Sequence, residues 1–231
     1  MRKFLWATLL VFAGCATQPR EEAPPATPPA AVQPAPAPPA APGATWKVVA
    51  SHLEVRVYRD GAMQKLGHNH LITSDRLEGE IALREPISAT SFTLRVPLES
   101  FVVDDAAART AAGGDFAASV PAQDAEGTRR NMLSEKLLDA IRNPVMTLAS
   151  ESVAGEPGNY QAAVRVSLAG AGHVVTAPFT VTIDGDSLKA HATLHLKHAD
   201  VGLQPFTAAL GALKVRDDFE VELTLEARRG T

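Results

Sequence analysis

The stretch from residue 159 to residue 198 constrains the fold most, because apolar and polar residues alternate through three consecutive segments of it. Alternation with a period of two places apolar side chains on one face of a β-strand and polar side chains on the other. Gly170 and Gly172 separate the first two segments, and Asp184-Gly185 is typical of a hairpin turn between the second and the third. The pattern therefore predicts an antiparallel sheet with one dry face.

Further segments carry the same alternation and bring the expected number of strands to eight. In the first of them, Val49, Leu53, Val55 and Val57 are expected to face inward. Strands are bounded by turn-forming residues and by the polar stretches between them. The additional strands are predicted at 46–57, 77–83, 92–98, 145–153 and 215–227.

One short helix is predicted outside the strands. Met132, Leu133, Leu137 and Ile141 have helical spacing, and Asn143-Pro144 ends the pattern. The preceding stretch, 104–130, is polar and rich in Ala and Gly and carries no clear structural pattern, so it is expected to be an inserted loop.

The predicted fold class is all-β: an eight-stranded antiparallel up-and-down barrel with one short helix and an inserted loop. Closing the sheet on itself removes exposed edges. A barrel of about eight strands either fills its interior with side chains or holds one small ligand. The inward positions are mostly Val, Ala and Leu, which favours a cavity suited to an apolar ligand.

The first residues read as a targeting segment that takes no part in the fold. Arg2-Lys3 is charged, and the apolar run that follows is shorter than the ~20 residues a membrane span needs. The stretch from Val11 to Cys15 resembles a bacterial lipobox, so residues 1–14 are expected to be a lipoprotein signal peptide and Cys15 to be lipidated. The alternative is an ordinary signal peptide with an unmodified Cys15.

A Pro/Ala-rich segment, 15–44, follows the expected cleavage site and separates it from the barrel domain at 45–231. This composition favours polyproline II and cannot build a core, so the segment is expected to be a tether. By resemblance to lipoproteins, Ala16 after Cys15 implies the periplasmic face of the outer membrane. The membrane is thus an expected partner through Cys15.

Charge and motifs exclude several classes of function. The net charge is −4 and no block of Lys or Arg stands out, so nucleic-acid binding has no electrostatic support. The sequence contains no Gly-x-Ser-x-Gly elbow, no His-Glu-x-x-His and no P-loop. It therefore predicts a binding protein that is not an enzyme and needs no cofactor.

Several segments, in their order and spacing, resemble the YceI-like family of lipid- and polyisoprenoid-binding proteins. The resemblance implies a lipocalin-like barrel that holds an isoprenoid, such as a polyprenyl chain or a quinone tail, in the periplasm. The segments that carry it are Arg130-Asn131-Met132, Leu137-Leu138-Asp139-Ala140, Asn143-Pro144, Leu168-Ala169-Gly170-Ala171-Gly172-His173, Asp200-Val201-Gly202-Leu203-Gln204-Pro205-Phe206 and Gly211-Ala212-Leu213-Lys214-Val215.

Residues expected to contact this ligand are the apolar inward positions and two histidines near the barrel mouth. They are Val55, Val57, Ile81, Leu83, Phe92, Leu94, Val96, Leu148, Val164, Val166, Phe179, Val181, Phe206, His68 and His70.

The segment Gly67-His68-Asn69-His70 departs from the simpler sequence of many relatives and leaves two readings open. Residues at i and i+2 on a strand lie on one face, so His68 and His70 could chelate a metal. No spacing fixes which further histidine would complete the site among His52, His173, His191, His195 and His198. The alternative is that His68 and His70 form hydrogen bonds in a loop or with a ligand headgroup. His191 and His195 fall on the polar face of their strand and are expected to be exposed. Three hypotheses remain: an isoprenoid carrier, a metal-binding protein or metalloenzyme, and a ligand-free envelope interaction module.

Overall fold

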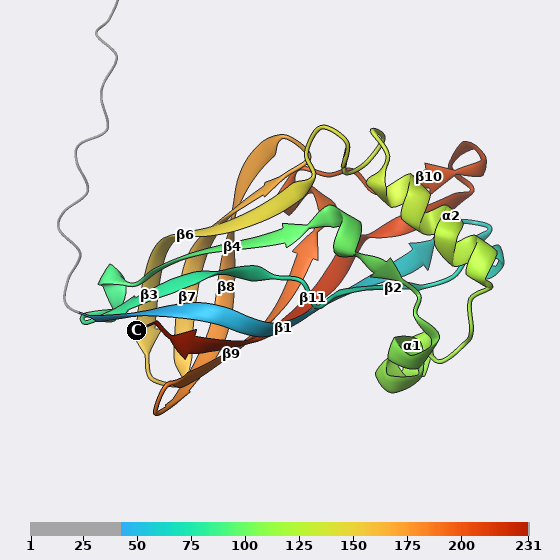
Figure 1. Cartoon of the computed structure of the whole chain (residues 1–231). Coiled ribbons are helices and arrows are strands. Elements are labelled where there is room, and N and C mark those ends of the chain that lie inside the picture. The colour runs from blue at the N-terminus through green and yellow to red at the C-terminus, as the bar shows by residue number, and fades with distance from the viewer. Residues whose placement is uncertain (1–42, 231) are drawn as a thin grey trace, which may run out of the picture. The chain divides into compact units, whose positions relative to one another are not determined.

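The computed structural model describes residues 43–230, and most of them form one closed antiparallel barrel of eight strands (Figure 1). Each strand pairs with the next, and β11 pairs with β1 to close the ring. The predicted fold class is confirmed. The barrel strands are β1 (Gly43–Asp60), β3 (Glu78–Arg84), β4 (Ser91–Pro97), β6 (Val145–Glu156), β7 (Asn159–Leu168), β8 (Ala171–Asp184), β9 (Ser187–Lys197) and β11 (Leu213–Arg229).

Short elements extend the wall and connect the strands. The first part of β1 pairs with β3 and its second part with β2 (His70–Ser74), which in turn pairs with β5 (Val102–Val103). The remaining short strand, β10 (Thr207–Ala208), pairs with β11. Single 3-10 turns connect several of these strands: η1 (Gln64–Leu66), η2 (Ile87–Ala89), η3 (Leu98–Ser100), η4 (Gly114–Phe116), η5 (His198–Val201) and η6 (Ala209–Gly211).

Two helices, α1 (Ala106–Ala112) and α2 (Ala122–Leu133), occupy much of the stretch 104–130, where an inserted loop was expected. The carboxylate of Asp105 caps α1 by accepting a hydrogen bond from the backbone N–H of Ala108. The helix predicted over 132–141 is wrong, because α2 ends at Leu133, close to where that helix was expected to begin. The apolar residues beyond it belong to a turn that folds back, with the N–H of Leu138 donating to the carbonyl of Met132.

Helix α2 packs beside β5 near one end of the barrel (Figure 1). Arg129 donates hydrogen bonds to the backbone carbonyls of Phe101 and Glu99, and the side chains of Met132 and Leu138 are buried in the core. These contacts fix the helix over the interior. In the part of the chain that the structure describes, no helix is long and apolar enough to cross a membrane.

A bulge in β1 changes which residues face inward. The register with β11 shifts between Val48 and Ala50, so Val49 is exposed, and its expected inward position is wrong. Trp46 faces the interior instead and is 1% exposed. Leu53, Val55 and Val57 lie beyond the bulge and do face inward, as expected.

Candidate functional site

An apolar cavity of about 460 Å³ lies inside the barrel, with side chains from all eight barrel strands in its wall. Ligand pockets in proteins typically enclose about 300–1,000 Å³. The interior is therefore not filled, and it has room for one small ligand.

Small inward side chains make this space. On the inner face Ala162 of β7 lies opposite Ala177 of β8, and Ala192 of β9 lies opposite Phe179 of β8. Residues directly opposite in an antiparallel pair point to the same face, so these alanines leave volume where larger residues would meet. The period-two pattern of each strand thus forms the apolar cavity wall, and the small side chains of the inward alanines leave the cavity wide.

Eleven of the fifteen residues predicted to contact a ligand lie in the cavity wall. The other four lie elsewhere: Val96 is fully buried in the packed core, and Phe206, His68 and His70 do not border the cavity. The wall also includes residues of β9 and β11 that were not singled out, such as Leu194, Leu196, Val221 and Leu223. The eleven are Val55, Val57, Ile81, Leu83, Phe92, Leu94, Leu148, Val164, Val166, Phe179 and Val181.

The two ends of the cavity differ in exposure. Near the β8–β9 hairpin, Ile183 is 46% exposed, and Tyr160, which stacks on Phe179, is partly exposed. At the opposite end the lining residues Phe101, Met132 of α2 and Val201 of η5 are all buried. The cavity is therefore more open at the hairpin end and closed at the end that α2 covers.

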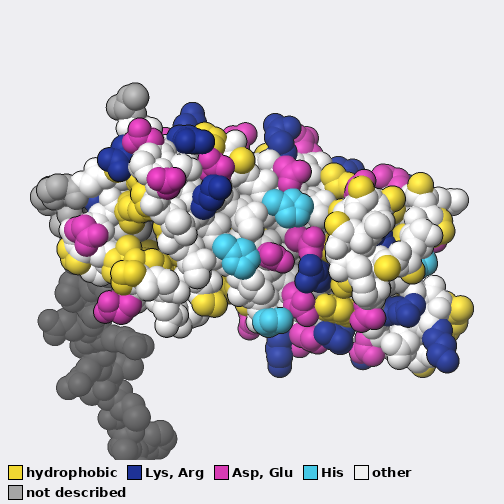
Figure 2. Space-filling model, turned by 90° about the horizontal axis from the view of Figure 1, so that it is seen from below, with side chains coloured by type: hydrophobic (Ala, Val, Ile, Leu, Met, Phe, Trp, Pro, Cys, Tyr) yellow, Lys and Arg dark blue, Asp and Glu magenta, His cyan; other side chains and the backbone are white. Residues whose placement is uncertain are grey.

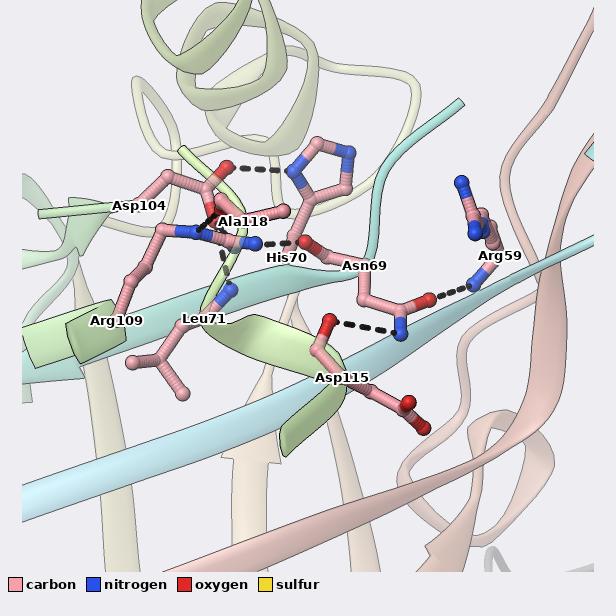
Figure 3. A network of polar contacts seen from close by, with 8 residues as sticks. All are labelled: Arg59, Asn69, His70, Leu71, Asp104, Arg109, Asp115 and Ala118. Atoms are coloured by element: carbon pink, nitrogen blue, oxygen red, sulfur yellow. Dashed lines mark hydrogen bonds and ion pairs between the residues drawn. The ribbon is translucent and has the colours of Figure 1, made fainter. Parts of the chain in front are cut away.

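His70 belongs to a buried polar cluster centred on Asp104 (Figure 3). The Asp104 carboxylate accepts hydrogen bonds from Nδ1 of His70 at 2.6 Å, from the backbone N–H of Leu71 at 2.9 Å and from the guanidinium of Arg109. Burial acts to raise the pKa of Asp104, but the hydrogen bonds from His70 and Leu71 and the neighbouring charges outweigh it and lower that pKa. Asp104 is therefore held as a carboxylate.

The same cluster explains the position of Asn69. The side-chain oxygen of Asn69 accepts from the backbone N–H of Arg59, and its backbone carbonyl accepts from Arg109. Arg109 is 3% exposed and also donates to the carbonyl of Ala118. The segment 67–70 thus joins the start of β2 to the end of β5 and to α1 through hydrogen bonds (Figure 3).

The metal hypothesis gains no support from this geometry. The rings of His68 and His70 lie edge to face with centroids 6.2 Å apart, and Nδ1 of His70 is taken by Asp104. Among residues 43–230, no group of three or more His, Cys, Asp or Glu side chains is placed to hold a metal ion.

Three other histidines lie on the outer face of the barrel: His52 on β1, and His191 and His195 on β9. His191 and His195 were expected on this face. The His191 ring is 3.2 Å from a carboxylate oxygen of Glu222, and the His195 ring is 3.9 Å from one of Glu220. His52 lies 2.7 Å from Asp75. Figure 2 shows histidine side chains among acidic and basic ones on one face of the molecule. The side chains of all three histidines are exposed to solvent, and His191 also belongs to the residues that line the cavity.

His198 is a buried histidine that borders the cavity. It lies in η5, directly after β9, and is 7% exposed. Its Nδ1 is 2.7 Å from the backbone carbonyl of Asp217, and its ring packs against Phe219 with centroids 5.1 Å apart. Sequence reasoning named His198 only as a possible partner in a metal site.

A closed antiparallel barrel around an apolar cavity defines a lipocalin-like β-barrel with room for one small ligand. A protein-family model described as the YceI-like domain matches residues 46–227. The chain belongs to the YceI-like family. No curated protein matches its sequence.

Solved structures share this fold at low sequence identity. BcnA of Burkholderia cenocepacia is 14% identical with a TM-score of 0.54, covering 76% of this chain and 95% of its own. A polyisoprenoid-binding domain from Saccharophagus degradans, implicated in plant cell wall breakdown, is 16% identical with a TM-score of 0.54, covering 82% of this chain and 100% of its own. The YceI protein of Campylobacter jejuni is 12% identical with a TM-score of 0.50, covering 69% and 85%.

Proposed function

We propose that this protein binds an amphipathic isoprenoid lipid inside the barrel and acts as a carrier or sequestering protein for it. The observation that carries the proposal is the cavity of about 460 Å³, whose wall is formed almost entirely by hydrocarbon side chains. Each buried methylene contributes about 0.8 kcal/mol, so a branched hydrocarbon tail gains affinity in proportion to the length it buries. A polar small molecule would lose its hydration there without hydrogen bonds in return.

The relatives favour an isoprenoid among apolar ligands. The Saccharophagus degradans domain with the same fold is described as polyisoprenoid-binding. At 16% identity this likeness concerns the fold, so the ligand class rests on the cavity and on family membership. A flexible prenyl chain suits a cavity that is closed at one end and partly open at the other.

We further propose that the protein works at the periplasmic face of the outer membrane, where a lipid on Cys15 anchors it. The segment 15–44 would then hold the barrel away from the membrane. These residues lie outside the described part of the chain, and the proposal rests on their sequence pattern. Because a single acyl chain anchors only marginally, the multiple chains of a lipoprotein would be needed for stable attachment. A Cys15→Ala variant should leave the membrane fraction, and its retention there would contradict the anchor.

The experiment that tests the lipid proposal is mass spectrometry of solvent extracts from the full-length protein purified from a bacterial envelope. We expect an organic compound with prenyl fragments in stoichiometric amount. Val166→Glu places a charge in the cavity wall and should abolish retention of the compound. Its matched control is Val174→Glu on the outer face of the adjacent strand, at a side chain that is already 48% exposed.

The outcomes separate the hypotheses. Lipid lost in Val166→Glu and kept in Val174→Glu, with circular dichroism showing both variants folded, supports binding in the barrel. No organic compound in the wild type contradicts the carrier function and favours a ligand-free interaction module. Equal lipid content in both variants places the lipid outside the cavity.

A further inference from the structure

We propose that two neighbouring loops at one end of the barrel insert into the surface of an anionic phospholipid bilayer. The loops are residues 61–67, between β1 and β2, and residues 207–212, which lead into β11. Together they are called the tip. This inference goes beyond the proposed function, because it concerns a surface outside the cavity and does not depend on what the cavity holds.

A hydrogen bond and close packing join the two loops. The backbone N–H of Met63 donates to the carbonyl of Ala212 at 2.9 Å. Gly61 packs against the same carbonyl, since a Cβ atom at this position would lie 2.6 Å from its oxygen. A Cβ atom at Gly67 would lie 3.7 Å from the side chain of Leu213, the first residue of β11. The two loops therefore form one surface, although they are far apart in the sequence.

Three large apolar side chains are exposed at the tip. Met63 is 41% exposed, Leu66 is 67% exposed and Leu210 is fully exposed. Single exposed apolar residues are normal on a protein surface, whereas several in one place mark an interaction surface. Strand β10, which leads into the turn that carries Leu210, lies at the end of the barrel away from the start of β1 (Figure 1). The tip thus presents apolar surface that the barrel itself does not bury.

The backbone of Leu210 makes its exposure harder to explain by the fold alone. Its φ is 55°, in the left-handed region that Gly and Asn adopt more readily than a residue with a large side chain. A fully exposed leucine gains no contact with the core in return for this conformation. A surface outside the protein that receives the side chain accounts for a leucine at this position.

The charges around the tip are complementary to an anionic surface. The stretches 61–74 and 201–214 contain no Asp or Glu, although the whole chain has a net charge of −4. They contain Lys65 and Lys214, which are both exposed. Asp60, at the border of the first stretch, pairs with Lys214 at 2.9 Å. A basic side chain beside an anionic bilayer typically strengthens binding about fivefold.

The composition of the tip favours a bilayer over a protein partner. Segments that bind at a membrane interface combine apolar side chains at the headgroup boundary with basic side chains that are attracted to anionic lipids. Aromatic residues and Arg are enriched at protein–protein interfaces, and both loops of the tip lack them. Leu66 and Leu210 therefore enter the headgroup boundary, and Lys65 meets the lipid phosphates.

The test follows tryptophan fluorescence at the tip in full-length protein that carries Cys15→Ala, so that no lipid anchor holds it to a membrane. Leu66→Trp places the fluorophore at the tip, and Val174→Trp places it at a 48% exposed position on the barrel wall as the control. The vesicles contain phosphatidylcholine alone or an equal mixture with phosphatidylglycerol. We expect the mixed vesicles to shift the emission of Leu66→Trp to shorter wavelengths and to leave that of Val174→Trp unchanged.

Further substitutions, added to Leu66→Trp, separate the apolar and the charged contributions. Leu210→Asn should raise the vesicle concentration needed for half of the shift about tenfold, because a leucine no longer leaves water. It should not lower stability in urea denaturation, since Asn adopts the left-handed region readily. Lys65→Gln should raise that concentration about fivefold. Val49→Asn, at an exposed position outside the tip, is the control and should have no effect.

Each outcome bears on the tip alone. A shift confined to Leu66→Trp and weakened by Leu210→Asn supports insertion of the tip. No shift, an equal shift in Val174→Trp, or a shift that Leu210→Asn leaves unchanged overturns the inference. A shift of the same size on phosphatidylcholine alone contradicts the role of the charges. Lipid extracted from the cavity should be the same in amount in all these variants, so failure of the tip leaves the proposed function standing.

Discussion

Nδ1 of His70 lies 2.6 Å from Oδ2 of Asp104, and the Asp104 side chain has no exposed surface. The guanidinium of Arg109 pairs with the other carboxylate oxygen of Asp104. Asp104 itself adopts a left-handed backbone conformation with φ 57°, which the surrounding hydrogen bonds hold. A charged cluster of this kind stabilises the fold only while every member keeps its partners.

Replacing Asp104 with Ala should therefore destabilise the protein strongly. The change leaves the buried guanidinium of Arg109 without its carboxylate, and breaking a buried ion pair typically costs about 3–5 kcal/mol. Urea denaturation followed by circular dichroism measures the loss. The double variant Asp104→Ala/Arg109→Met should recover part of it, because no unpaired charge is then buried. A loss below about 1 kcal/mol in the single variant would contradict the role of the cluster.

The contribution of Asp104 should also depend on pH. Because the pKa of Asp104 is lower in the folded than in the unfolded state, its carboxylate stabilises the fold above the unfolded value of about 3.9. This stabilisation is lost as the pH falls through the folded-state pKa. The stabilities of wild type and Asp104→Asn should differ at pH 7, and the difference should begin to shrink near the unfolded value of about 3.9 and vanish only below the lower folded-state pKa. A difference that stays constant over this range would show that ionisation of Asp104 is not its source.

The cluster also shows where sequence reasoning stops. Period-two alternation is a local pattern, and it located all eight barrel strands because each strand has one face on the interior. Besides Asp104, Arg109 donates to the carbonyls of Asn69, forty residues away in the chain, and Ala118, and no regular spacing encodes these contacts. One local signal in the stretch 104–130 was Asp105, whose capping of α1 could have indicated a helix.

The cavity wall and its volume were predictable to different degrees. Inward residues such as Val55 and Phe179 follow from the alternation, whereas the bulge after Val48 reverses the pattern and exposes Val49. The volume depends on how residues of neighbouring strands meet, as Ala162 and Ala177 do, and a single strand does not reveal it. His198 was hard to recognise for the same reason, since Asp217 and Phe219 lie on another strand.

Filling the cavity should reduce lipid binding without introducing a charge. Ala177→Phe adds a ring on the inner face of β8, where it would occupy space beside Phe179. The adjacent Thr176→Phe adds the same ring on the exposed outer face and is the control. We expect the content of bound lipid, measured by mass spectrometry of extracts, to fall at least several-fold in Ala177→Phe alone. Equal content in the two variants would argue against the cavity as the binding site.

Trp46 should stabilise the barrel through packing and not through its indole nitrogen. The side chain is 1% exposed, and within the described residues its Nε1 has no hydrogen-bond partner. Trp46→Ala removes a large buried side chain, which typically costs about 3–5 kcal/mol. Trp46→Phe loses less volume and no hydrogen bond, so it should cost clearly less in urea denaturation. The guanidinium of Arg229 lies 5.0 Å from the centre of the Trp46 ring and can stack equally on Phe at position 46. Arg229→Ala should therefore lower the free energy of unfolding by less than about 1 kcal/mol, both in the wild type and in Trp46→Phe. If Trp46→Phe and Trp46→Ala lowered the free energy of unfolding equally, packing alone would not explain the contribution of Trp46, and its indole nitrogen would have to form a stabilising interaction.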